Sequence, residues 1–173
     1  MNRKRGFTLI EMAVVLLIIG ILAGIVLRNV GSQGVVARDS KRLADINLIH
    51  NYAVQYLQAK GVFPPSTVDS WTELVTDITG AGIVDKLPSD PGGNAYDYFS
   101  CVTTGVTPAV GVPASHYIVQ STLEQTSTKA PALYKEAMTA MPTGFECYKT
   151  GTKLDTTSFG TNCTAANKFC SLQ

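Results

Sequence analysis

Hydrophobic residues are concentrated near the N-terminus, where they form an almost unbroken apolar run. Residues 7–27 read FTLIEMAVVLLIIGILAGIVL, with one charged residue, Glu11, and no proline. As an α-helix this segment spans about 32 Å at about 1.5 Å per residue, close to the hydrocarbon core of a bilayer, about 30 Å. We therefore expect residues 7–27 to form a transmembrane helix.

The helix is expected to continue as an amphipathic segment over residues 28–60. Apolar positions recur there at steps of three or four residues, at Leu43, Ile46, Ile49, Ala53 and Leu57. The charged residues Arg38, Asp39, Lys41, Arg42 and Asp45 are expected on the other faces. A stop is predicted at Lys60–Gly61, because glycine suits the C′ position and Pro64–Pro65 prevents the helix from resuming.

Residues 61–173 are expected to form one globular domain. Ser70 to Glu73 reads as a capping box that opens a short helix ending at residues 80–82. Strands are predicted at residues 96–102, 116–123 and 145–149, and a short helix at 132–141. The expected fold class is α+β, with a long N-terminal helix packed on a small antiparallel β-sheet.

Charge changes this picture only at the N-terminus. The 173 residues carry a formal net charge of +1, and beyond Arg3, Lys4 and Arg5 there is no block of like charge. Composition therefore indicates no nucleic-acid partner. The basic cluster before the apolar run predicts that the short N-terminal leader stays in the cytoplasm, so the rest of the chain faces outward.

A secretory signal peptide explains this N-terminus less well. The apolar run exceeds the usual 7 to 15 residues, and no A-x-A-like cleavage site follows it. A carboxylate, Glu11, also interrupts its start.

Glu11 is informative because an ionisable group in a membrane segment is costly and usually has a function. Hydration at the interface, or a cation of the leader, can satisfy it. Alternatively, cleavage after Gly6 creates a new α-amino group at Phe7, four residues before Glu11.

The sequence R-G-F-T-L-I-E, followed by the apolar run, resembles the class III signal of type IV pilins and pseudopilins. The resemblance implies that a prepilin peptidase removes the leader, residues 1–6, between Gly6 and Phe7 and methylates the Phe7 amine. It also implies that residues 7–27 enter a filament core, where Glu11 pairs with Phe7 of a neighbouring subunit. Arg28 departs from the pattern, because many family members carry a helix-bending proline near the end of the apolar run.

The same resemblance implies partners and a location. The chain is expected in the inner membrane as a single-pass protein in contact with lipid. An inner-membrane assembly machinery then builds it into a homopolymer, or a copolymer with other pilins. The filament is extracytoplasmic, in the periplasm or at the cell surface.

The four cysteines, Cys101, Cys147, Cys163 and Cys170, are expected to form disulfides. Their number is even, and they follow a membrane segment, which suits an oxidising compartment. No C-x2-C spacing indicates a metal site. Three pairings are possible; if the strands that hold Cys101 and Cys147 are neighbours, these two can bond and leave Cys163 and Cys170 to close a C-terminal loop. Such a loop resembles the variable region of many pilins.

Two filament types fit this pattern. The cysteines and the C-terminal loop favour a subunit of a type IV pilus-like filament, which is the leading hypothesis. The pattern L-P-x-D-P-x-G-N-x-Y at residues 87–96 is similar to major pseudopilins, so a pseudopilin of a type II secretion system is the alternative. A membrane-tethered binding protein or enzyme is the alternative of another class.

Catalysis has no support in the sequence. The two histidines, His50 and His116, have no partner identifiable from sequence and are expected on a surface or partly packed. Motifs such as G-x-S-x-G, the P-loop and H-E-x-x-H are absent. Asp85, Asp90, Asn94 and Asp97 crowd a turn, and we interpret them as turn residues rather than metal ligands. Neither enzymatic activity nor a cofactor is expected.

Overall fold

The computed structural model describes residues 7–64, 71–105, 114–149 and 152–173, with the side chains of residues 26–32 and 156 excepted. The leader, with Arg3 to Arg5 and Gly6, and the residues that open the predicted capping box at Ser70 lie outside these ranges. The chain divides into two units, residues 1–37 and 38–173, which are described separately below.

The long helix α1 spans Leu9–Lys60 and continues through Arg28 without interruption. It ends where the sequence predicted, since Gly61 has a φ of +77° and its N–H donates to the Leu57 carbonyl at 2.7 Å. Glycine reaches this left-handed conformation without the steric cost of a Cβ, so it closes the last turn.

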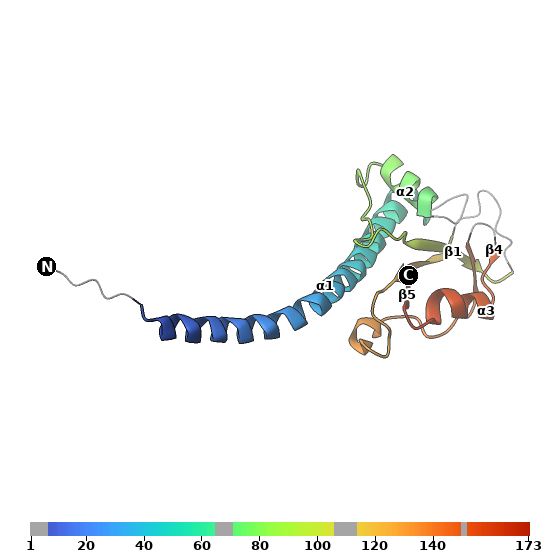
Figure 1. The fold of residues 1–173 in the computed structure, drawn as a ribbon. Coiled ribbons are helices and arrows are strands. Elements are labelled where there is room, and N and C mark those ends of the chain that lie inside the picture. Colours follow the sequence, from blue (N-terminus) through green and yellow to red (C-terminus); the bar gives the residue numbers. More distant parts are fainter. Residues whose placement is uncertain (1–6, 65–70, 106–113, 150–151) are drawn as a thin grey trace. The chain divides into compact units, whose positions relative to one another are not determined.

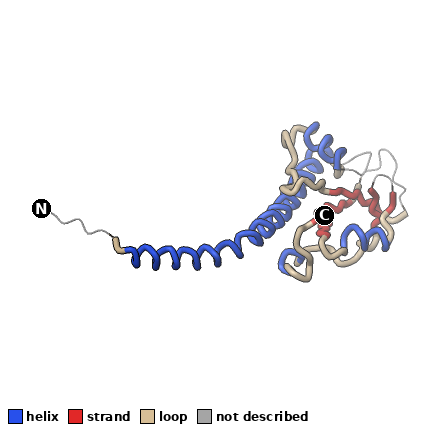
Figure 2. The backbone as a smooth tube through the Cα atoms, in the orientation of Figure 1, coloured by secondary structure: helices blue, strands red, loops and turns tan. Residues whose placement is uncertain are grey.

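Antiparallel strands, red in Figure 2, form one sheet within the described residues. Their order in the sheet is β4-β3-β1-β2-β5. The strands predicted from sequence are present as β1 (Asp97–Thr103), β2 (His116–Thr122) and β3 (Phe145–Lys149). Two edge strands, β4 (Thr152–Lys153) and β5 (Lys168–Leu172), were not predicted. β4 (TK) has two polar residues, and β5 (KFCSL) has five residues without strict alternation, so neither produces a clear alternating pattern.

The two faces of the sheet bury different clusters, because successive strand residues point to opposite sides. Tyr98 and Tyr117 face α1 and pack with Ile46, Ile49 and Leu74. Leu74 belongs to helix α2 (Trp71–Gly80), which was predicted from sequence. The α1 residues predicted to face the core, 43, 46, 49, 53 and 57, are buried or half-buried, which confirms the amphipathic stripe.

The opposite face is covered by the C-terminal part of the chain (Figure 1). Phe99 and Ile118 of the sheet pack there with Leu154 and Phe159, and Phe159 closes the short helix α3 (Thr156–Phe159). A π-helix, η2 (Gly160–Thr164), follows directly. The sheet therefore buries an apolar cluster on each of its two faces.

The prediction of a helix at residues 132–141 was mostly wrong. Only a four-residue 3-10 helix, η1 (Pro131–Tyr134), forms there. After η1 the backbone runs beside the edge strand β5, where the Met138 N–H donates to the Cys170 carbonyl at 2.9 Å. An N–H used in this way is unavailable for a continuing α-helix, so the edge contact outweighs local helical propensity.

Candidate assembly site and buried charge cluster

The start of α1 is fixed by a capping box formed by Thr8 and Glu11. Both the backbone N–H and the hydroxyl of Thr8 donate to Oε2 of Glu11 at 2.8 Å, and the Glu11 N–H donates to the Thr8 hydroxyl at 3.3 Å. This T-x-x-E arrangement satisfies N–H groups that have no partner within the helix. Glu11 therefore has a local role that the sequence-based reasoning missed, although the spacing of threonine and glutamate could have revealed it.

The helix that follows this cap presents apolar side chains on all of its described faces. Phe7 is 80% exposed, and Leu9 is 87% exposed. Large apolar side chains remain exposed through Ile25, and a Cβ added at Gly20 or Gly24 would meet nothing within 4 Å. Exposed apolar surface of this extent marks a site of association with lipid or protein.

Described side chains in α1 stop at Ile25 and resume at Gln33. Within those described parts, no helix is long and apolar enough to cross a membrane.

The structure places the sequence-predicted site residues as follows. Gly6 lies outside the described residues, and Phe7 and Glu11 both lie at the exposed start of α1. In this chain Phe7 is joined to Gly6, so its nitrogen is an amide and offers Glu11 no cation. The pairing of Glu11 with a Phe7 amine consequently stays a prediction.

A second polar constellation lies in the globular unit and was not expected. The guanidinium of Arg42, fully buried on α1, donates to Asp90 through both Nε and Nη2. Its Nη1 donates to Asp39 at 2.6 Å and to Glu124 at 3.0 Å. We call these four residues the buried charge cluster. The sequence-based expectation that Asp39, Arg42 and Asp45 lie away from the buried side of α1 was wrong, because all three are buried.

The buried charge cluster joins three segments that are distant in sequence. Asp90 belongs to the turn segment 87–94, and its Oδ2 also accepts the N–H groups of Gly92 at 2.8 Å and Asn94 at 3.0 Å. Asp39 accepts the N–H groups of Glu124 and Gln125, both at 2.9 Å, just after β2. The carboxylates of Asp90 and Asp39 thus each fix a loop while they pair with Arg42.

These contacts shift the acid–base behaviour of the cluster. Hydrogen bonds from Arg38, and then from Arg42, lower the pKa of Glu124 to about 2. Burial raises the pKa of Asp90, but the donors from Arg42, Asn94 and Gly92 together outweigh burial and lower the pKa. The carboxylates of Glu124 and Asp90 are therefore held ionised, as a buried arginine requires.

Gly92 is needed for the close approach in this cluster. A Cβ at this position would lie 2.5 Å from Nη2 of Arg42 and 3.0 Å from Oδ2 of Asp90. A glycine in the turn therefore makes room for the guanidinium. Asp90 accepts hydrogen bonds from the backbone of its own turn, so it acts as a turn residue, as expected from sequence.

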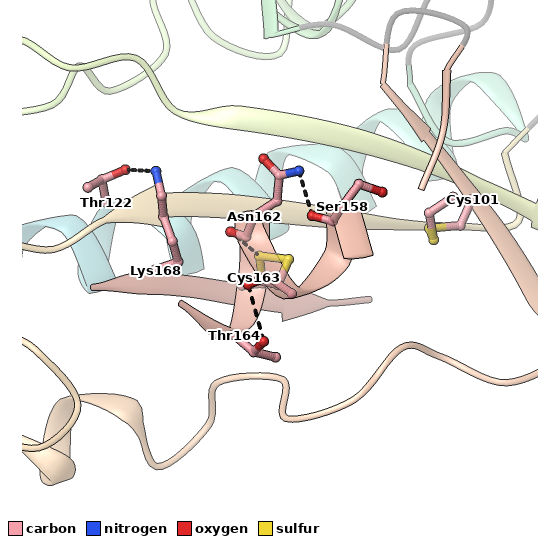
Figure 3. Close-up of a disulfide and its surroundings, with 10 residues drawn as sticks. Cys101, Thr122, Ser158, Asn162, Cys163, Thr164 and Lys168 are labelled. Atoms are coloured by element: carbon pink, nitrogen blue, oxygen red, sulfur yellow. Dashed lines mark hydrogen bonds between the residues drawn. A yellow bond between two sulfur atoms is a disulfide. The ribbon is translucent and has the colours of Figure 1, made fainter. Parts of the chain in front are cut away.

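Both disulfides are present, in the pairing Cys101–Cys147 and Cys163–Cys170. Cys101 and Cys147 are directly paired residues on β1 and β3. The second bond ties η2 to β5 (Figure 3), where Lys168 also donates to the Thr122 hydroxyl at 2.7 Å. The two bonds hold together the apolar cluster on the face of the sheet away from α1.

His50 is more deeply buried than expected. It is 6% exposed, its Nδ1 lies 3.0 Å from the Tyr117 hydroxyl, and its Nε2 has no partner among the described residues. Burial lowers the pKa of His50 to about 4, because the charged form loses its hydration.

This burial predicts a pH dependence of stability. Between about pH 6.5 and pH 4 the unfolded chain binds a proton at residue 50 that the folded chain does not bind, so stability falls as pH falls. Protonation of this histidine in the unfolded chain lowers the free energy of unfolding by about 3 kcal/mol at the acidic end of this range. We expect His50→Gln to reduce the change in unfolding free energy between pH 7 and pH 4, measured by urea denaturation. An unchanged pH dependence in this variant would contradict the assignment.

Spacing carries a partial signal for the buried charge cluster, at Asp39 and Arg42 only. Positions 39, 42, 46, 49 and 53 follow one another at three- or four-residue steps, so Asp39 and Arg42 extend the apolar stripe toward the N-terminus. Charged residues in line with such a stripe indicate buried, paired charges. Their partner Asp90 has no comparable signal, because 48 residues separate it from Arg42.

Comparison with known proteins agrees with the N-terminal motif. The prokaryotic N-terminal methylation motif matches residues 1–27. The type II secretion system core protein G of Vibrio cholerae serotype O1 is 37% identical over 58% of this chain and 73% of that protein. The proteins of the same name are 36% identical in Pseudomonas aeruginosa, over 60% of this chain and 79% of that protein, and 34% identical in Aeromonas hydrophila, over 57% and 75%. No solved structure matches the chain significantly.

The sequence identity to these relatives, the share of their length that is matched and the methylation motif all indicate the same family, and the pilin-like α+β fold agrees with it. The chain belongs to the type II secretion system core protein G family, a pseudopilin family among the type IV pilin-like proteins.

Proposed function

We propose that this protein is a structural subunit of a type II secretion filament and that it polymerises through the N-terminal half of α1. The observation that carries the proposal is the exposed apolar helix behind a prepilin-type N-terminus, in a chain whose relatives are named as secretion-system core proteins. The leading hypothesis from sequence was a type IV pilus subunit. Those relatives favour the alternative, a pseudopilin of a type II secretion system. The pattern at residues 87–96 supports the same choice.

Maturation begins with removal of residues 1–6. A prepilin peptidase cuts between Gly6 and Phe7 and methylates the new amine. The cut removes three cations, so the side-chain charge changes from +1 to +1 − 3 = −2. Loss of this basic anchor weakens the hold on the cytoplasmic face of the inner membrane, where residues 7–27 form the single span. Extraction into an extracytoplasmic filament then becomes easier.

Burial of the apolar helix against neighbouring subunits replaces its contact with lipid. Apolar surface gains little from leaving lipid for protein, so a polar contact is needed to fix how subunits align. Glu11 supplies it. Its Oε2 is held by Thr8, whereas Oε1 accepts no hydrogen bond among the described residues. The capping box therefore leaves one carboxylate oxygen for the Phe7 amine of a neighbouring subunit.

The role of Glu11 is tested by two substitutions that separate charge from capping. Glu11→Ala removes both, whereas Glu11→Gln keeps an N3 residue able to complete the capping box and removes only the charge. We expect both variants to be cut after Gly6 and both to lower filament yield at least about tenfold, because an ammonium left without its carboxylate is costly in an apolar core. Filament is measured in the sheared fraction of cells that express the assembly system.

Intact mass of the subunit from membranes provides the control. It reports cleavage before Phe7 and methylation in the wild type and in both variants. Normal filament yield from Glu11→Gln would contradict the charge pairing. A wild-type chain that keeps residues 1–6 beside its own peptidase would instead favour a membrane-tethered protein over a filament subunit.

A further inference from the structure

The segment between β4 and β5 forms a lid on the face of the sheet away from α1. We define the lid as residues 155–165, which include α3 and η2. Of its described side chains, only those of Phe159 and Cys163 are buried, and both pack in the apolar cluster with Phe99 and Ile118 of the sheet. The lid therefore shields apolar side chains that water would otherwise reach.

The hydrogen bonds of the lid stay within it or go to β5. The Ser158 N–H donates to Oδ1 of Asp155 at 2.7 Å, and the Asn162 amide donates to the Ser158 carbonyl at 2.7 Å (Figure 3). The Lys168 N–H of β5 donates to the Ala165 carbonyl at 2.9 Å. Among the residues that the structure describes, no hydrogen bond joins the lid to β1, β2 or β3.

Two fixed points flank the lid. On one side the Leu154 N–H donates to a carbonyl of β3 at 2.8 Å, and on the other side the Ala166 carbonyl accepts an N–H from the segment after β2 at 2.7 Å. Between these points the lid is held by burial of Phe159 and by the disulfide Cys163–Cys170. Burial of one aromatic side chain does not offset the conformational entropy of a segment of this length, so the disulfide decides whether the lid is closed.

A small reductant can approach this disulfide from one side. Cys163 and Met138 line a cavity of about 240 Å³ between η2, β5 and the segment that follows η1. The other disulfide lies inside the strand ladder, because Cys101 and Cys147 are directly paired residues of β1 and β3. Attack on that bond requires the two strands to separate, so the two disulfides differ in access.

We propose that Cys163–Cys170 is a redox-sensitive latch whose reduction by a dithiol opens the lid while the rest of the fold persists. One thiolate of the dithiol attacks a sulfur of the latch, and its second thiol then closes the dithiol to its own disulfide. The Sγ–Sγ bond of the latch breaks, and Cys163 and Cys170 each take up one electron and one proton. Local opening of the lid exposes Phe99 and Ile118. The cluster that faces α1 has no cysteine among its described members, so its packing is kept.

Graded reduction of the full chain in detergent micelles tests the latch. Dithiothreitol is added until one disulfide per chain is open, the free thiols are alkylated, and hydrogen exchange is followed by mass spectrometry. We expect the alkyl groups on Cys163 and Cys170. Amides of residues 155–165 are expected to exchange at least about tenfold faster than in the oxidised chain, because the lid opens locally. Peptides from α1 between residues 43 and 60 should exchange at an unchanged rate.

Two double variants separate the latch from reduction in general. Cys163→Ala/Cys170→Ala should show fast exchange of the lid without dithiothreitol, whereas Cys101→Ala/Cys147→Ala should keep the lid protected until dithiothreitol is added. Alkylation of Cys101 and Cys147 first, unchanged exchange of the lid after the latch is reduced, or faster exchange in α1 as well would each overturn the proposal. None of these measurements involves filament assembly, so the proposed function is tested separately.

Discussion

Arg42→Met is expected to destabilise the globular unit by about 3 to 5 kcal/mol, the cost of breaking a buried ion pair by removing one partner. The side chains of Arg42, Asp39 and Asp90 are at most 2% exposed, so water does not replace the lost guanidinium. The carboxylates then stay buried without their cation or take up protons. Either outcome weakens the loops that they hold through Gly92, Asn94, Glu124 and Gln125.

Unfolding of the full chain in urea, in detergent micelles, measures this loss. The single tryptophan, Trp71, is a suitable probe because it packs edge-on against Tyr96 beside the turn segment, with ring centroids 5.4 Å apart. Arg38→Met is the matched control. Arg38 pairs with Glu124 at 2.5 Å, but its side chain is 41% exposed and water can replace the lost contact, so its removal should cost much less stability than removal of Arg42. Equal losses in the two variants would show that burial of Arg42 does not set the strength of the cluster.

The two disulfides are expected to stabilise the fold unequally. Cys101–Cys147 closes a separation of 46 residues, and Cys163–Cys170 closes one of 7. A cross-link restricts the unfolded chain more when it closes a longer loop, so the loop-entropy relation gives about 4 kcal/mol for the first and about 2 kcal/mol for the second. Two double variants, Cys101→Ala/Cys147→Ala and Cys163→Ala/Cys170→Ala, compare these values by urea denaturation.

This comparison is internally matched because all four cysteines are buried and lie in one apolar cluster. Each double variant therefore removes the same two sulfur atoms from similar surroundings. Losses of equal size, or a larger loss for the Cys163–Cys170 pair, would show that local packing outweighs the restriction of the unfolded chain.

The elements with strong periodicity were determined by the sequence itself. The three-and-four-residue spacing from Leu43 to Leu57 specified which side of α1 is buried, and Gly61 specified where the helix ends. The strands that hold Cys101, Tyr117 and Cys147 were predicted close to their observed bounds, because aromatic and β-branched residues recur in them. The Gly6, Phe7 and Glu11 signature depends on local sequence alone, so it could be recognised without a structure.

Tertiary structure alone decided the features that depend on distant partners. Whether Cys101 meets Cys147 depends on β1 lying beside β3, and residue spacing permitted three pairings. The segment after Tyr134 follows the edge of β5, a contact that outweighs its helical tendency. Arg42 and Asp39 are charged, and charge usually indicates exposure; only Asp90 and Glu124, brought from distant loops, make their burial possible. Spacing placed Asp39 and Arg42 in line with the apolar stripe, but it could not identify their partners, because Asp90 and Glu124 lie 48 and 82 residues away from Arg42 in the sequence.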